Sequence, residues 1–208
     1  MAVTRRSFAV ALSATIAAPS GVQTGDLLIA CVARFNSTTP PALPAGWTDI
    51  TSGAHSAFGA SFRVCYRIRQ AGDGANYTFT NAQEGCIVAY EVGTFDAANP
   101  TGPGSLNSAG ASTTITATGV TTETNDALLC AYLTHGGNNP TSNHGFSSVI
   151  NVATFGTDST FWEATQAAAG ASGNKTWTTP SSPWSAQLIS INPAPPSATP
   201  RFHAQIIA

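Results

Sequence analysis

The sequence predicts an all-β protein, more specifically a jelly-roll-like β-sandwich formed by two pseudo-repeated halves, with an extended C-terminal arm. Short apolar segments alternate with turn signals along the chain, and no stretch carries a helical period with caps at both ends. Four segments of the first half also return, in the same order, in the second. The matched pairs are GDLLIACVA (25–33) with NDALLCAYL (125–133), GWTDI (46–50) with GFSSV (145–149), AGDGANYTFT (71–80) with AGASGNKTWT (169–178), and CIVAYEV (86–92) with AQLISIN (186–192). The repeated unit is therefore a scaffold of strands and turns, which is typical of two half-sheets sharing one core.

Six strands are expected in the first half, near residues 8–17, 26–34, 47–51, 61–69, 76–80 and 85–92. The first follows Arg5-Arg6 and has features of a twin-arginine export signal. Its period of two, with Phe8 and Val10 alternating with smaller residues, favours a strand instead. The run LLIACVA (27–33) is apolar at every position, which predicts a central strand covered on both faces.

The strand near 61–69 contains a regular alternation. Its inward positions are expected to be Phe62, Val64, Tyr66 and Ile68. Its outward positions include Arg63 and Arg67, and Arg69 follows them. These three arginines form a candidate docking stripe for an acidic partner. The commoner interpretation is a solvated strand face that discourages edge pairing.

Six strands are likewise expected in the second half, near residues 112–120, 126–134, 146–154, 160–168, 174–178 and 185–192. We predict one sandwich domain over residues 1–193, with half-repeats at about 8–97 and 112–193. The alternative is two independent domains joined near 97–112, where the Pro- and Gly-rich sequence is typical of a linker. A single sandwich is preferred because the central strands are too apolar to lie at an edge.

Residues 194–208 have no counterpart in the first half. The segment NPAPPSATP (192–200) is a stiff, extended spacer, and RFHAQIIA (201–208) is a short apolar terminus. This terminus is either a frayed end or an arm that adds a strand to a neighbouring subunit or to the surface that carries the protein. Its candidate docking residues are Arg201, Phe202, Ile206 and Ile207.

The composition limits the classes of function. Only 9% of the 208 residues are charged, against roughly 25% in an ordinary soluble domain, and 42% are hydrophobic. A net charge of −2 and a single lysine, Lys175, argue against nucleic acid as a partner. No apolar run reaches the roughly 20 residues of a membrane-spanning helix, so we expect no membrane insertion.

The residues that could perform chemistry are few and scattered. The four cysteines, Cys31, Cys65, Cys86 and Cys130, have no metal-binding spacing and are expected to be buried free thiols, with one or two disulfides as the alternative. The ten acids form no DxD or ExxE pair, and Asp26, Asp73 and Asp126 are expected to cap turns. His135 and His144 flank a loop, but no third ligand follows at a metal-binding spacing. We therefore expect no catalytic residue, no metal and no cofactor.

Four tryptophans could stack on sugar rings if they were exposed. Trp47 and Trp177 correspond to Phe146 and Phe79 in the repeat, which favours a place in the core for both. Trp162 and Trp184 lie nearer to loops and are the better glycan-binding candidates, although burial is the more common fate of such residues.

Several short motifs resemble a family of proteins encoded among the virion genes of tailed bacteriophages and prophages. The motifs are Pro-x-Gly-Val (19–22), GDLLIA (25–30), PAGWT (44–48), YRI (66–68), YTFT (77–80) and IVAYEV (87–92). The resemblance covers Phe8 to about Pro193, and its motifs are structural. It implies a β-sandwich virion component, such as a capsid decoration protein, a head fibre or a tail-associated protein, and it carries over no catalytic residues.

With this resemblance, we expect a non-enzymatic virion structural protein, made in the host cytoplasm and placed on the capsid surface in many copies. Its partners would be the major capsid protein or other virion subunits, and a homo-oligomer such as a trimer would suit a local threefold axis. The alternative is a tail or fibre module that binds host glycans through Trp162 or Trp184.

Overall fold

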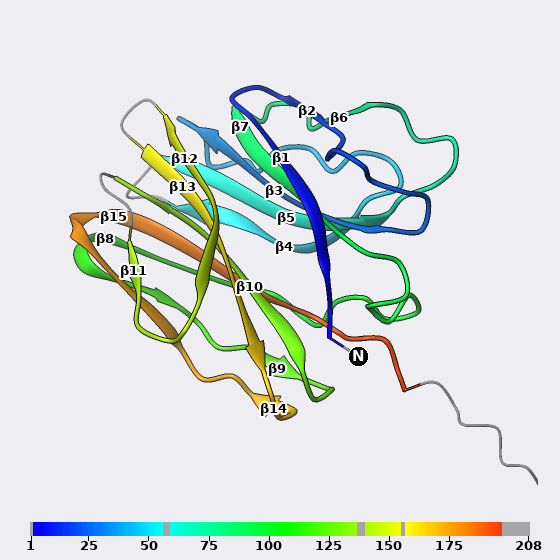
Figure 1. Cartoon of the computed structure of the whole chain (residues 1–208). Helices are drawn as coiled ribbons and strands as arrows, with labels where there is room; N and C mark the ends of the chain where they lie inside the picture. Colours follow the sequence, from blue (N-terminus) through cyan, green and yellow to red (C-terminus); the bar gives the residue numbers. More distant parts are fainter. Residues whose placement is uncertain (1, 56–58, 137–139, 155–156, 197–208) are drawn as a thin grey trace, which may run out of the picture.

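Two antiparallel sheets, each built from one half of the chain, pack face to face (Figure 1). The computed structural model describes residues 2–55, 59–136, 140–154 and 157–196. The first sheet has the strand order β1 (Arg5–Ala11), β7 (Glu84–Tyr90), β3 (Leu27–Phe35), β5 (Ala60–Ile68) and β4 (Thr48–His55). No helix occurs among the described residues, so the predicted all-β class is confirmed.

The second sheet repeats this order. It consists of β8 (Ser105–Ala117), β15 (Lys175–Ile191), β10 (Ala127–His135), β13 (Thr157–Gln166) and β12 (Ser147–Thr154), and the short strand β11 (Thr141–Ser142) also pairs with β15. Two small ribbons complete the fold: β2 (Thr15–Ala17) with β6 (Asn76–Thr78), and β9 (Thr121–Thr122) with β14 (Gly170–Ala171). A sandwich of two pseudo-repeated halves is therefore confirmed, while the finer jelly-roll connectivity stays a prediction.

The two apolar runs singled out in the sequence form the centres of the sheets. Every residue of β10 is buried, and in β3 the run 27–33 is buried throughout. Each of these strands has a strand on both sides and packed side chains on both faces, as the continuous apolar pattern predicts.

Three hydrophobic layers result from this arrangement. The inner layer lies between the sheets and contains side chains of both halves, for example Leu27, Val88, Leu128 and Ile189. A first outer layer covers the opposite face of the first sheet, and a second outer layer covers the opposite face of the second sheet. Both faces of both sheets are thus packed. The hydrophobic side chains of the chain are therefore buried in three layers and not only in the inner one.

Each outer layer contains a Trp–Phe pair. The tryptophan and the phenylalanine occupy exchanged positions in the two halves. Trp47 meets Phe79 with ring centroids 5.1 Å apart and an interplanar angle of 67°. Phe146 meets Trp177 at the same 5.1 Å and at 62°. The repeat match of Trp47 with Phe146 and of Phe79 with Trp177 is therefore confirmed, as is the burial of both tryptophans.

The match of the central strands is corrected by one residue. Leu27 and Ile29 of β3 face the inner layer, and so do Leu128 and Cys130 of β10. The sequence match paired Leu28 with Leu128, but Leu28 belongs to the first outer layer. Because a shift of one residue exchanges the two faces of a strand, Leu27 corresponds to Leu128, 101 positions further along.

The turns before these strands support the corrected register. Gly25 has a positive φ of 92°, and its N–H donates to the carbonyl of Arg69 at 2.9 Å. Asp126 has a positive φ of 59°, and its N–H donates to the carbonyl of Ala167 at 3.2 Å. Asp126 is therefore the structural counterpart of Gly25, not of Asp26.

Other expected boundaries also change. The strand expected at 8–17 is two strands, β1 and β2, and the strands expected at 174–178 and 185–192 are one long strand, β15. The register of β15 against β8 shifts near Pro180 and Pro183, which cannot donate ladder hydrogen bonds. Part of the expected linker at 97–112 belongs to β8, which begins at Ser105.

Candidate functional site

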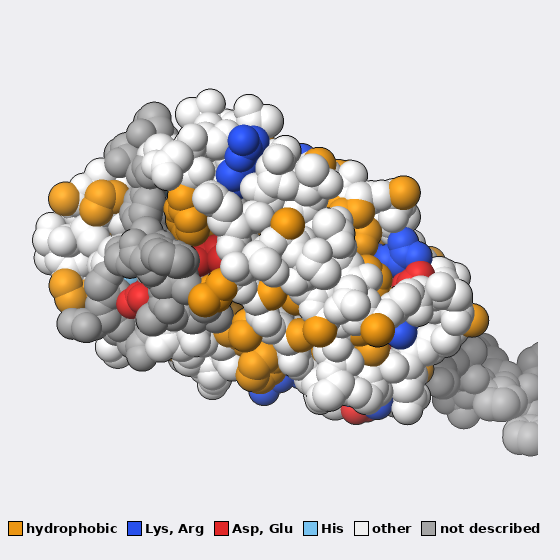
Figure 2. Space-filling model, turned by 90° about the horizontal axis from the view of Figure 1, so that it is seen from above, with side chains coloured by type: hydrophobic (Ala, Val, Ile, Leu, Met, Phe, Trp, Pro, Cys, Tyr) orange, Lys and Arg blue, Asp and Glu red, His pale blue; other side chains and the backbone are white. Residues whose placement is uncertain are grey.

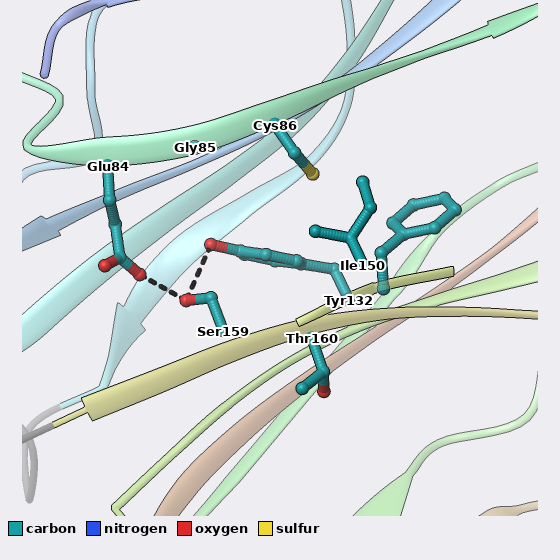
Figure 3. A pocket seen from close by; sticks show the side chains of 8 residues that line it. Glu84, Gly85, Cys86, Tyr132, Ile150, Ser159 and Thr160 are labelled. Carbon is teal, nitrogen blue, oxygen red and sulfur yellow. Dashed lines mark hydrogen bonds between the residues drawn. The ribbon is translucent and has the colours of Figure 1, made fainter. Parts of the chain in front are cut away.

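A first polar cluster crosses the space between the sheets. Glu84 of β7 is 2% exposed, and its carboxylate accepts a hydrogen bond from the Ser159 hydroxyl of β13. The Tyr132 hydroxyl of β10 donates to the same Ser159 oxygen at 3.2 Å, as Figure 3 shows. An acid of the first half is thus held by side chains of the second half.

A small cavity lies beside this cluster (Figure 3). Its walls come from β7, β10, β12 and β13, and the lining residues are Glu84, Gly85, Cys86, Tyr132, Ile150, Ser159, Thr160 and Phe161. Its volume of about 10 Å³ leaves room for at most one water molecule. The cavity therefore suits one water next to the carboxylate, not a substrate, since ligand sites usually enclose several hundred Å³.

A second polar cluster also crosses between the sheets, with its acid in the second sheet and the partners of that acid in the first. Glu163 of β13 accepts a hydrogen bond from the Tyr90 hydroxyl at 2.7 Å, and Arg5 of β1 donates to it at 2.6 Å. The Tyr90 oxygen also lies 3.3 Å from the sulfur of Cys130. Burial raises the pKa of Glu163, although Tyr90 and Arg5 oppose that rise. Here an acid of the second half is held by side chains of the first.

The two clusters lie at different places along β13. Ser159, which holds Glu84, is four positions from Glu163 along β13, a separation of about 13 Å in a strand. What the clusters can do is fix how one sheet lies on the other, because buried hydrogen bonds are directional.

The four cysteines are free and buried, as the sequence predicted. Cys31 and Cys86 lie opposite each other on β3 and β7. Burial raises the pKa of the Cys31 thiol well above its usual value, and burial likewise raises the pKa values of Cys65 and Cys130. A thiol with a raised pKa stays protonated at neutral pH. These side chains therefore behave as small apolar core residues and not as nucleophiles.

The arginine stripe faces away from the inner layer, as predicted, but its charges are engaged within the chain. Arg63 donates to Asp49 at 2.5 Å, and its side chain is 15% exposed. Arg67 forms an ion pair with Asp73 and is 17% exposed. The proximity of Arg67 lowers the pKa of Asp73.

Arg69 is engaged as well, since it donates to the Tyr77 hydroxyl at 2.7 Å. The charges of Arg63 and Arg67 are therefore balanced by carboxylates, whereas the partner of Arg69 is a neutral hydroxyl. Neighbouring carboxylates also fasten loops to the sheet. Asp73 accepts the N–H of Gln70 at 3.0 Å, and Asp26 accepts the N–H of Gln23 at 2.8 Å, which confirms the expected caps at both turns.

Both glycan-binding candidates lie in the second outer layer. Trp162 is 7% exposed and Trp184 is 4% exposed. Stacking on a sugar requires an open ring face, which neither side chain presents.

The remaining candidates give no metal site among the described residues. His135 is buried in β10, and the ring of exposed His144 lies 3.2 Å from the Thr176 hydroxyl. Within the described ranges, no group of three or more histidine, cysteine or acidic residues could hold a metal ion. Arg201, Phe202, Ile206 and Ile207 lie outside the described residues.

The sequence did not foresee an apolar edge. Phe8 and Val10 of β1 are 44% and 45% exposed, and Leu12, just beyond the strand, is 54% exposed. On the face seen from above Figure 1, hydrophobic side chains are spread among uncharged ones, and charged side chains are few (Figure 2). The alternation at 8–12 signalled a strand, but it could not show that these positions would lack a covering layer.

No protein-family model, no curated protein and no solved structure matches this chain. Over the part of the chain that the structure describes, no helix is long and apolar enough to cross a membrane.

Proposed function

We propose that this protein is a non-enzymatic structural component of a tailed-bacteriophage virion, attached to the capsid surface in many copies. In this role it would reinforce the particle by binding across neighbouring capsid subunits. The virion family that the sequence motifs resemble supplies the biological setting, and the physical properties of the molecule support the mechanical part of the proposal.

The observation that carries the proposal is the packing of both sheets on both faces. Three hydrophobic layers and two polar clusters tie the halves into one body, with side chains of both halves in the inner layer. Dense packing of this kind transmits load with little deformation. A molecule that stiffens a shell needs that property.

The surface composition supports the same role. Glycine, serine, threonine and asparagine replace most of the charged residues, and the net charge is only −2. The five ion pairs found among the described residues are all arginine–carboxylate pairs, most of them partly screened from solvent. Attachment through hydrogen bonds and apolar contacts would therefore depend weakly on salt.

Quantitative mass spectrometry of purified phage particles tests the proposal. Hundreds of copies per particle would support a capsid location, and a few to dozens would place the protein in the tail and overturn that location. Absence from washed particles would overturn the virion role itself. Particles lacking the protein should also release DNA at a lower temperature than complete particles, and equal release temperatures would contradict reinforcement.

A further inference from the structure

Among the sheet edges that the structure describes, that of β1 is distinguished by exposed large hydrophobic side chains. β1 pairs only with β7, so its second edge carries unpaired backbone groups. Sheet edges are usually protected by charges, proline or a covering segment, because an apolar edge pairs readily with another strand. After Arg6, the sequence SFAVAL (7–12) contains no charge and no proline, and it holds three of the five exposed large hydrophobic side chains of the described residues.

The exposed side chains of β1 continue the inner face of the first sheet. Phe8 lies opposite Val88, and Val10 lies opposite Cys86, and both of these partners belong to the inner layer. Side chains directly opposite each other in a sheet share a face. Phe8 and Val10 therefore extend the inner layer to the rim of the sandwich, where the second sheet leaves them half exposed. A strand added to β1 would cover them.

The segment 201–208 has the pattern that this edge requires. Phe202, Ala204 and Ile206 alternate with other residues at a period of two, so in a strand they would share one face. An antiparallel register would place Ile206 opposite Phe8, Ala204 opposite Val10 and Phe202 opposite Leu12. The only Lys, Arg, Asp or Glu side chain of the segment is Arg201, and it would lie beyond the apolar stripe.

In this antiparallel register, the position of the last described residues requires that the added strand come from another copy of the chain. The N–H of Ala194 donates to the carbonyl of Thr94 at 3.1 Å, and the N–H of Thr4 donates to the Thr94 hydroxyl at 3.1 Å. Ala194 therefore lies beside the start of β1, whereas the antiparallel register places Phe202 beside its far end. In Figure 1 the chain leaves the sandwich close to its N-terminus.

The length of the spacer excludes insertion into the same molecule in this register. From Thr4 to Leu12 a strand spans about 26 Å. The eight positions from Ala194 to Phe202 span about 25 Å in the extended conformation that a proline-rich spacer adopts. The spacer would be used up on reaching the far end of β1, and no residues would remain for the reversal that an antiparallel strand needs.

We propose that residues 201–208 of one copy add to the free edge of β1 of a second copy as an antiparallel strand. The interface joins two different surfaces of the chain, so it closes only as a ring or as a reciprocal exchange between two copies. The inference does not depend on the proposed virion role, because it concerns the purified protein alone.

Mass measurement by light scattering across a concentration series tests this inference on the full-length chain. The wild type is expected to exceed the monomer mass of 21.2 kDa as its concentration rises. Val10→Lys and Ile206→Asp should each remain monomeric, the first because it disables the edge and the second because it disables the arm. Val92→Lys is the matched control, since Val92 is 50% exposed but lies outside β1, and it should associate like the wild type.

A mixing experiment separates arm insertion from pairing of two β1 edges. Val10→Lys keeps an intact arm, and Ile206→Asp keeps an intact edge, so an equimolar mixture should form a heterodimer of twice the monomer mass. A wild type that stays monomeric at its solubility limit would overturn the proposal. Association of Ile206→Asp at the wild-type level would also overturn it, since the two β1 edges would then be pairing directly. A mixture that stays monomeric would overturn it as well.

Discussion

The two sheets share a strand order but differ at their rims. Val10 lies opposite Cys86 on the edge of the first sheet, and Leu106 lies opposite Gln187 at the equivalent place in the second. Leu106 packs against Gly53 of β4, so closely that a Cβ on that glycine would overlap the leucine side chain. Val10 remains 45% exposed. The sandwich is therefore closed where β8 meets β4 and open along β1. The burial of two equivalent positions thus depends on whether the opposite sheet packs against them.

The two outer layers should contribute similarly to stability, and this gives the largest expected effect. Trp177 is fully buried in the second outer layer, as Phe79 is in the first. We expect Trp177→Ala and Phe79→Ala each to lower the free energy of unfolding by about 3–5 kcal/mol, through lost burial and the cavity left behind. Urea titrations followed by circular dichroism measure the change.

The shape of those unfolding curves tests whether the sheets behave as one unit. Because the inner layer contains side chains of both halves, each variant should unfold in a single transition at a lower midpoint. Two separate transitions in either variant, with one at the wild-type midpoint, would show that the halves fold independently.

A smaller effect is expected where β7 of the first sheet requires a glycine and the second sheet does not. A Cβ on Gly85 would lie 2.7 Å from the carbonyl oxygen of Cys31 and 2.7 Å from the Val32 side chain. The equivalent position of β15 holds a buried alanine, Ala186. We expect Gly85→Ala to cost about 1–3 kcal/mol through crowding.

Gly72→Ala is the control for this crowding, since its Cβ would have no heavy atom within 4 Å. The stability of Gly72→Ala, measured by the same urea titration, should stay within about 0.5 kcal/mol of the wild type. Equal losses at positions 72 and 85 would mean that crowding against β3 is not the cause.

The acids of the two halves should give opposite dependences of stability on pH. Burial raises the pKa of Glu163 in the folded state, so the unfolded chain loses this proton first as pH rises. The contribution of Glu163 is complete below its unfolded pKa of about 4.3 and is lost as pH rises through the raised folded value. The difference in stability between wild type and Glu163→Gln should therefore fall with rising pH over that window.

Asp73 provides the comparison in the first half. Its hydrogen bond from Arg67 lowers its pKa, so its contribution is present above the unfolded pKa of about 3.9 and is lost as pH falls through the lowered value. The stability difference between wild type and Asp73→Asn should rise with pH in the acid range. Urea midpoints measured across the pH series give both slopes, and slopes of the same sign would contradict the assignment.

Patterns within single strands were readable from the sequence, whereas relations between strands were not. The run 27–33 predicted a doubly covered strand because each of its positions is apolar, and the exchanged Trp47–Phe79 and Phe146–Trp177 pairs were visible as a repeat. The one-residue error at Leu128 arose because adjacent apolar residues align equally well in two registers. Only the face of the sheet distinguishes them.

The partners of the charged residues were hidden for a related reason. Arg63 and Arg67 were assigned correctly to the outward face, but the sequence does not indicate that Asp49 and Asp73 meet them there. Glu84 and Glu163 likewise gave no signal, because their partners lie in the opposite half of the chain. Contacts between distant segments depend on how the sheets pack, and no local pattern encodes that.

The smallest expected effect returns to the two rims. Leu106→Thr removes a side chain that packs against β4 and should lower the free energy of unfolding by about 1 kcal/mol. Val10→Thr keeps the shape of the side chain at an exposed position and should change it by less than about 0.5 kcal/mol. Urea titrations at concentrations where the protein is monomeric measure both values. If Val10→Thr lowered the free energy of unfolding as much as Leu106→Thr, the edge of β1 would have to be covered within the same molecule. The two rims would then differ in their residue types and not in how well their side chains are packed.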